Sequence, residues 1–341
     1  MSVASFLRAR TFLFVLAAGA AAGVPLPAQE RVDGAIQKHG FFQQTIQPEE
    51  ISVTHGSKFK GAHKVAISVF NVAFPSDNHF KAVSKGHSLF GGFSSSAKAT
   101  MSTVMTGVDQ ATRQRIADKA YALFVEQLTG AGYEVVDIAT LGKLVPEYTQ
   151  WKALPSPSQG RFGTYLAPTG HPLFFLQGDS AKRDTSGTMG QQLSAFRALD
   201  RPEAFSRSPY IAHDGHLGII AVTLVVDYGV YSSSGQKGLG KNATVGFKPG
   251  VTIAAGNFTD SGTMLEYWGP NSGGFPAGAY LQQPIRSALP FATATGQGSA
   301  DVVVSDQEVT VVADPAKFEA AAAEVVGQAV PKLVSVMAAA R

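Results

Sequence analysis

The sequence predicts an α/β (α+β) fold, in which a mixed sheet starts with a β-α-β unit, continues as an antiparallel meander and carries a C-terminal helix packed on the sheet. Three patterns predict it: a helix between two apolar strands, a later run of alternating strands, and an amphipathic segment at the end of the chain. With 341 residues, 45% of them hydrophobic, the chain is long enough to bury one large core.

The β-α-β unit begins at residues 64–74, whose β-branched and aromatic side chains are typical of a strand buried on both faces. Asp109 offers an N-cap for a helix that runs to about residue 129, and residues 133–138 form the second strand. A shorter helix is expected over residues 141–154. Because a crossover helix joins parallel strands of one sheet, this order predicts a sheet covered by helices.

Two long segments lack a regular pattern. Residues 79–107 are rich in glycine, serine and lysine, and we expect a long loop there. Residues 155–209 contain scattered prolines, glycines and serines, so we expect an insertion with a binding or lid role outside the core.

The meander begins at residues 217–231, which alternate as in a long half-buried strand whose other face carries Thr223 and Asp227. Residues 243–254 pair with this strand as a hairpin, and residues 263–268 add a third strand. The pattern therefore predicts antiparallel pairing in the second half of the chain.

The chain ends with a strand over residues 301–313 and a helix. Asp314 supplies the N-cap of this helix, and Pro315 occupies its first position, where a missing N–H is tolerated. Phe318 and Leu333 belong to an apolar stripe along the helix, so we expect the helix to dock on the sheet.

Residues 1–28 have the pattern of a secretory signal peptide. Arg8 and Arg10 precede an apolar run that is too short to span a bilayer, and small residues with prolines follow it as far as Ala28. Residues 29–341 are then one exported domain, which is periplasmic, associated with the outer membrane, or secreted. No second apolar run reaches the roughly 18 residues of a spanning segment, so no transmembrane helix is predicted.

The composition removes several classes of function. The net charge of +3 is spread along the chain without a basic run, which argues against nucleic-acid binding. The chain has no cysteine, so it has neither disulfides nor the lipid attachment site of a lipoprotein. No motif indicates a cofactor, and the acidic residues are too dispersed to assign a catalytic residue.

Two groups of side chains are candidates for binding. His213 and His216 flank Asp214 and would ligate a divalent metal if a third ligand came from the N-terminal half; the alternative is a polar turn with local hydrogen bonds. An aromatic surface for a glycan or a protein partner is the second candidate, and the alternative is that its rings pack their loops down. The rings of this surface are Tyr165, Phe174, Phe175 and Trp268.

Five segments, taken in order, resemble the curli-secretion-channel-like (CsgG-like) envelope proteins. They are KVAISVFNVAF (64–74), LFVEQLTGAGYEVVD (123–137), DIATLGKLVPE (137–147), LGIIAVTLVVDYG (217–229) and VTIAAGNFTDSGTMLEYWG (251–269), the last with the turn Asp260-Ser261-Gly262. The chain departs from the family in lacking the cysteine of its many lipoprotein members, and in residues 155–209, which have no counterpart there. The resemblance implies an α/β envelope domain that acts through surfaces and assembly.

We therefore expect an exported cell-envelope protein that acts by binding or assembly with envelope or secretion partners, and the sequence favours a non-enzymatic role. The expected partner is an envelope protein or a glycan, and association into a homo-oligomer stays open. The alternative is an exported hydrolase or carbohydrate-active enzyme with its site near residues 155–216. Convergent carboxylates or histidines in a deep cleft favour the enzyme, whereas polar loops over a flat surface favour the binding protein.

Overall fold

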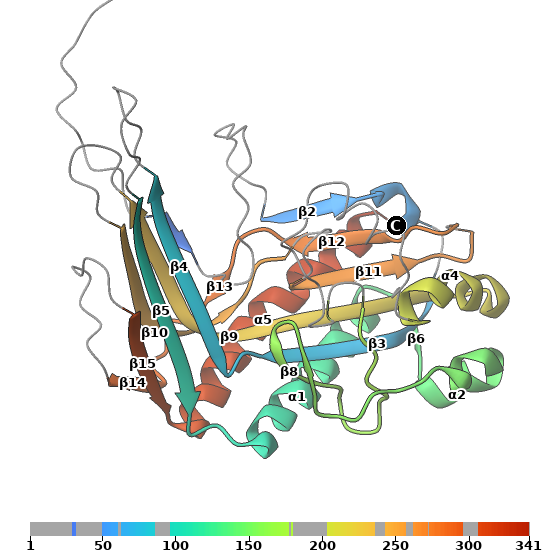
Figure 1. Cartoon of the computed structure of the whole chain (residues 1–341). Helices are drawn as coiled ribbons and strands as arrows, with labels where there is room; N and C mark the ends of the chain where they lie inside the picture. The colour runs from blue at the N-terminus through green and yellow to red at the C-terminus, as the bar shows by residue number, and fades with distance from the viewer. Residues whose placement is uncertain are drawn as a thin grey trace, which may run out of the picture.

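The computed structural model contains two sheets and the helices that cover them (Figure 1). The structure describes residues 29–31, 50–60, 63–85, 96–176, 179, 203–235, 243–256, 262–271, 273–295 and 306–340. The predicted signal peptide lies outside the described residues, and so do Asp260 and Ser261 of the predicted turn.

A mixed sheet forms the centre of the fold, in the order β2-β12-β11-β9-β3-β8-β7. Its strands are β2 (Ile51–Thr54), β12 (Ala277–Leu281), β11 (Met264–Trp268), β9 (Gly218–Gly235), β3 (Lys64–Phe74), β8 (Gly163–Leu166) and β7 (Ser158–Gly160). Four more strands extend it: β1 (Gln29–Arg31) and β10 (Ala243–Ile253) pair with β9, β6 (Glu134–Val136) pairs with β3, and β13 (Ile285–Arg286) pairs with β10.

The two central strands, β3 and β9, pair in parallel. β3 is buried on both faces from its second residue onward, as its apolar sequence predicts. β9 is buried on both faces too, since Thr223 is completely buried and Asp227 is only 4% exposed. The expectation of a half-buried strand is therefore wrong, because further elements cover the face that carries these two polar side chains.

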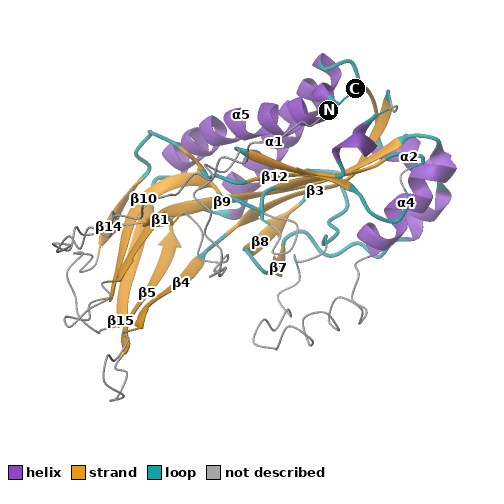
Figure 2. Cartoon of the chain, turned by 90° about the horizontal axis from the view of Figure 1, so that it is seen from above, coloured by secondary structure: helices purple, strands orange, loops and turns teal. Residues whose placement is uncertain are grey.

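Helices lie on both faces of the central sheet and give the fold three layers (Figure 2). The first face packs on α1 (Gln110–Gly130) and α5 (Pro315–Ala339) in one apolar core. The second face packs on α2 (Ile138–Leu144), the 3-10 helix η2 (Pro146–Gln150) and α4 (Glu203–Gly215). A further 3-10 helix, η1 (Gly56–Phe59), lies against β11 and β12.

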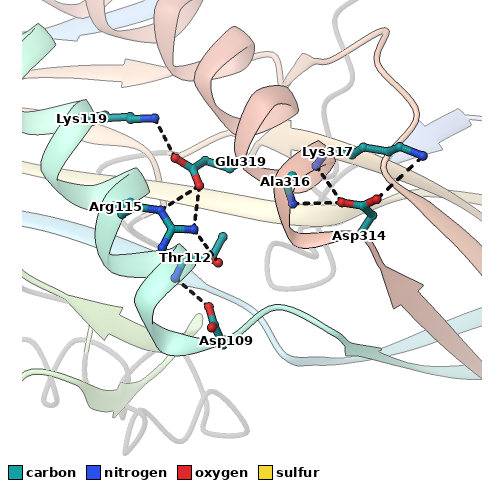
Figure 3. A network of polar contacts seen from close by, with 8 residues as sticks. All are labelled: Asp109, Thr112, Arg115, Lys119, Asp314, Ala316, Lys317 and Glu319. Carbon is teal, nitrogen blue, oxygen red and sulfur yellow. Dashed lines mark hydrogen bonds and ion pairs between the residues drawn. The ribbon is translucent and has the colours of Figure 1, made fainter.

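The terminal helix α5 begins where the sequence predicts. Asp314 Oδ1 accepts hydrogen bonds from the backbone N–H groups of Ala316 and Lys317, at 3.0 and 3.1 Å (Figure 3). These bonds satisfy two of the N–H groups that a helix leaves unpaired at its start. Asp109 caps α1 in the same way, through the backbone N–H of Thr112 at 2.8 Å.

An ion-pair network connects α5 to α1. Glu319 accepts hydrogen bonds from Arg115 and Lys119 at 2.9 and 2.7 Å (Figure 3). Both cationic side chains are more than half exposed, 53% and 64%, so the pairs contribute little to stability. The helix is held mainly by its apolar stripe, which is buried from Phe318 to Met337.

A second sheet projects from the end of the central sheet that lies opposite α2 and α4 (Figures 1 and 2). We call it the hairpin sheet; its order is β14-β15-β5-β4. Its strands are β4 (Asp77–Lys85), β5 (Ser96–Thr106), β14 (Ala292–Thr295) and β15 (Asp306–Ala313). β4 and β14 run antiparallel to their partners, whereas β5 and β15 are parallel to each other. The inner face of this sheet packs Met101 and Val309 against Tyr231 and Val245 of the β9–β10 pair.

The predicted fold class is confirmed: the sheets are mixed, and the C-terminal helix packs on the central sheet. The loop expected at residues 79–107 is wrong, since β4 and β5 cover most of this range. Residues 86–95, which hold most of its glycine, lie outside the described residues.

The structure corrects the expectation of an insertion at residues 155–209 for the first part of that range. β8 pairs with β3, and β7 pairs with β8, so residues 158–166 belong to the central sheet, where Tyr165 is completely buried. Residues 203–209 begin α4. The sequence signal is weak here because β7 and β8 are too short to show a period.

Among the described residues, α5 is the one helix long and apolar enough to cross a membrane, with a mean hydropathy of 1.2. Half of its most apolar window is buried inside the protein. A core helix passes the same test of length and composition, so this observation is weak evidence for a membrane span.

Candidate functional site

The four predicted binding aromatics do not form an exposed surface. Tyr165 and Trp268 are completely buried, Phe174 is 5% exposed and Phe175 is half-buried. Trp268 packs edge-on against Phe205 of α4, with ring centroids 5.7 Å apart. The prediction of an aromatic binding surface is therefore wrong, because these large rings gain more free energy from burial in the core than from exposure.

The predicted metal ligands lie at the exposed end of α4. His213 Nδ1 lies 2.9 Å from Asp214 Oδ1, and the rings of His213 and His216 are 6.3 Å apart. Within the described ranges, no group of three or more His, Cys, Asp or Glu side chains is placed to hold a metal ion. The geometry therefore favours the alternative, a polar turn with a local hydrogen bond.

A layer of polar side chains lies on the sheet face that is turned towards α2 and α4. Asn71, Thr223 and Glu266 come from β3, β9 and β11 and are close to one another by strand register. The Asp179 carboxylate accepts a hydrogen bond from the Tyr165 hydroxyl at 3.1 Å and one from a backbone N–H at 2.8 Å. It also makes longer contacts, both 3.5 Å, with Asn71 and Thr223. Asp179, which follows β8 in the chain, thus contacts side chains of three strands, β8, β3 and β9.

The two acids of this layer are shielded from water. Burial raises the pKa of Asp179 to about 7, against the hydrogen bonds it accepts, which lower it. Burial also raises the pKa of Glu266 to about 8, and the nearby Asp179 carboxylate adds to this effect. Asp179 is 0% and Glu266 4% exposed, so neither can meet a substrate in this conformation. The pair belongs to the core and not to an open active site.

A polar pocket of about 240 Å³ lies where the central sheet passes into the hairpin sheet. The turn between β7 and β8 forms one wall, and it approaches β3 closely at Gly163, whose φ is +96°. A Cβ at this position would lie 2.5 Å from the carbonyl oxygen of Phe74, so only glycine fits. The polar side chains of the lining are Asp77, Asn78, Gln159, Arg161 and Asp227.

The hairpin sheet ends on each side in a strand whose outer edge has no described partner. Its order ends at β14 on one side and at β4 on the other, and no strand of the described ranges pairs with either outer edge. Such an edge presents a row of backbone N–H and C=O groups that another strand can pair with. On the outer face of the sheet, Val312 is 47% exposed.

The sequence pattern did not identify the pocket or the acid layer. Asp227 gave a usable signal, because a carboxylate interrupts an otherwise apolar strand, but we placed it on an exposed face. Asp179 gave none, since the residues around it show no period. Asp77 and Arg161 meet in the pocket lining only because separate strands fold together.

We compared the chain with protein-family models, curated proteins and solved structures. No family model, curated protein or solved structure matches it. The resemblance to curli-secretion-channel-like proteins therefore stays a prediction from the order of elements.

Proposed function

We propose that the protein is an exported cell-envelope protein that acts by binding and assembly. Strands of a partner, in the first place those of a second copy of the chain, pair with the edge strands of the hairpin sheet. One observation carries this proposal: the sheet ends in β4 on one side and β14 on the other, with no further described strand on either edge. The signal-like pattern of residues 1–28 supports export.

The two edges favour pairing between copies of the chain. They belong to different strands, so β14 of one copy would pair with β4 of the next in a head-to-tail contact. β14 contains only alanine and threonine, without the charged residues or proline that protect many edge strands. Backbone hydrogen bonds would supply affinity, as in other cases of strand addition. Repetition of this contact gives a ring or an open filament.

The assembly proposal predicts that the mature protein self-associates and that proline in β14 weakens the association. The two variants to compare are Thr293→Pro and Ala294→Pro. Successive N–H groups of a strand point to opposite edges, so one proline removes an N–H from the open edge and the other removes one from the pairing with β15. We expect the proline on the open edge to reduce the amount of oligomer at an unchanged melting temperature. The proline that removes an N–H from the pairing with β15 should lower the melting temperature.

Sedimentation equilibrium of the wild type and both variants, over a range of concentrations, measures this effect. Each variant serves as the control for the other, because both carry the same substitution in the same strand. A wild-type protein that stays monomeric throughout would contradict the proposal. So would two folded variants that associate as strongly as the wild type.

The export proposal predicts that replacing Leu13, Phe14 and Leu16 with aspartate keeps the chain in the cytoplasm. The apolar run would then no longer enter the translocation channel. Cell fractionation with immunoblotting measures the change. Detection of residues 12–23 in the exported wild-type protein by N-terminal sequencing would show that this segment is not a cleaved signal.

A further inference from the structure

Glu266 is an acid in the middle of an apolar surface. On β11 it lies between Met264 and Trp268, and the alternation of the strand places all three on the sheet face that α4 covers. Its neighbours across the sheet are Ala221 and Gly278, which carry no polar side chain. Glu266 is only 4% exposed, and its Oε2 atom has no hydrogen-bond partner among the described residues. A neutral carboxyl is tolerated here at moderate cost, whereas a carboxylate would be an uncompensated charge in the core.

The ionisable groups around Glu266 are acids and phenols. The Asp179 carboxylate raises the pKa of Glu266, the Tyr280 hydroxyl of β12 lowers it by a smaller amount, and no cationic group of the described residues acts on it. Tyr165 of β8 and Tyr148 of η2 lie in the same layer, and burial raises the pKa of both above the usual value for tyrosine. Ionisation of Glu266 therefore adds a second negative charge beside Asp179 without an opposite charge to balance it.

The elements packed on β11 add no other ionisable group to this face. The described positions of α4 that are buried against the sheet carry side chains that do not titrate; they are Ala204, Phe205, Ser208, Ile211 and Ala212. The 3-10 helix η1 reaches β11 from the opposite face, where Phe59 packs on Tyr267 with ring centroids 5.5 Å apart. Water can reach the Glu266 carboxyl only if the cover formed by α4 moves away.

α4 is a lighter cover than α5 on the other face of the sheet. Phe205, which packs on Trp268, and Ile211 are the large apolar side chains that the described part of α4 buries, whereas α5 buries a stripe along its whole length. Pro209 lies inside α4 and lacks the N–H for one helical hydrogen bond. The ion pair of Arg207 with Glu147 is 2.7 Å long, but both side chains are partly exposed, 43% and 35%, so it holds the helix weakly. Elements with few buried contacts open at lower free energy than the core of a domain.

We propose that the protonation state of Glu266 controls whether α4 stays packed on the central sheet. With a proton on the carboxyl, α4 covers the face; loss of the proton favours an open form in which α4 has left the sheet and water surrounds the carboxylate. Opening uncovers the apolar strip of Met264 and Trp268, which the closed form hides. The edges of the hairpin sheet take no part in this opening, so the inference holds or fails independently of the proposed assembly.

The sign and the window of the pH dependence follow from the two states of Glu266. Its pKa is about 8 under the closed cover and near 4 when the side chain is exposed to water, so the closed form binds the extra proton between these values. The equilibrium constant for opening then rises by up to about tenfold for each pH unit and levels off above about pH 8. Between pH 6 and pH 8 we expect an increase of about 50-fold.

Native-state hydrogen exchange of the mature protein, read out by mass spectrometry at pH 6 and pH 8 over a series of low urea concentrations, tests this inference. Peptides from α4 are compared with peptides from α1, after correction for the intrinsic pH dependence of amide exchange. We expect α4 to exchange through an opening that depends little on urea and that is about 50-fold more populated at pH 8. Amides of α1 should be better protected, with exchange that increases steeply with urea. Equal protection and equal urea dependence of α4 and α1 would overturn the proposal, and this comparison needs no variant.

Glu266→Gln assigns the effect to one group. Glutamine cannot ionise, so α4 of this variant should open to nearly the same extent at both pH values. Glu308→Gln, on an exposed position of β15, is the matched control and should behave as the wild type does. A urea midpoint close to that of the wild type at pH 5 establishes that the variant is folded. A 50-fold rise that persists in folded Glu266→Gln would contradict the assignment to Glu266.

Discussion

Truncating Leu333 to alanine is expected to lower the free energy of unfolding by about 2 to 5 kcal/mol. Leu333 is completely buried in the stripe of α5 that packs on the central sheet and on α1. Removing its side chain leaves a cavity in the apolar core between α5 and the central sheet, and tight packing allows little collapse into it. A domain is commonly stable by only about 5 to 15 kcal/mol, so this loss should be visible in urea denaturation.

Leu144→Ala is the matched control for this experiment. It removes the same atoms from a helix, but Leu144 lies at the end of α2 and is 47% exposed. We expect its effect on the urea midpoint to be several times smaller, because less apolar surface and no deep cavity are involved. Equal midpoints for Leu333→Ala and wild type would mean that α5 does not seal the core in solution.

Elements with strong local signals were predictable from the sequence. β3 combines β-branched and aromatic residues over its whole length, and α1 and α5 begin at the aspartates that cap them. These signals are local, because a cap acts within one turn and an apolar stripe repeats every three or four residues. They were enough to identify the class of fold and the terminal helix.

The hairpin sheet was not predictable in this way. β5 alternates Met101, Thr103 and Met105 towards the interior, but serine and threonine between them weaken the contrast that marks a strand. β5 is held partly by parallel pairing with β15, which lies about two hundred residues away in the chain. The local period of a strand does not say which distant segment it pairs with, so neither strand could be assigned its partner.

The pocket depends on the same long-range contacts. Asp77, Arg161 and Asp227 come from three separate parts of the chain and meet only after both sheets have formed. The predicted aromatic surface is an error of the opposite kind, because it was predicted from the sequence and is absent from the described structure. Tyr165 stood out by residue type in a segment of irregular pattern, and Trp268 did so at the end of a predicted strand. Residue type alone does not separate a binding ring from a core ring.

The buried acid layer should make the protein more stable in mildly acidic than in mildly basic solution. In the folded protein the pKa of Asp179 is about 7 and that of Glu266 about 8, whereas both groups titrate near pH 4 when unfolded. Between these values the native state binds more protons than the unfolded state, so stability falls as the pH rises from about 4 to about 8. Each pKa unit corresponds to about 1.4 kcal/mol. A shift of about three units in one group therefore lowers the free energy of unfolding by about 4 kcal/mol over this pH range.

Glu266→Gln is the variant that isolates this effect. Glutamine has nearly the same shape but stays neutral, so it avoids placing a charge at Oε2, an atom with no hydrogen-bond partner among the described residues. We expect the urea midpoint of the variant to exceed that of the wild type at about pH 8 and to differ little at about pH 5. Glu308→Gln, on an exposed position of β15, provides the matched control and should follow the wild-type profile. A wild-type midpoint that is constant or rises over this range, or a Glu266→Gln profile parallel to it, would show that the layer does not carry buried protons.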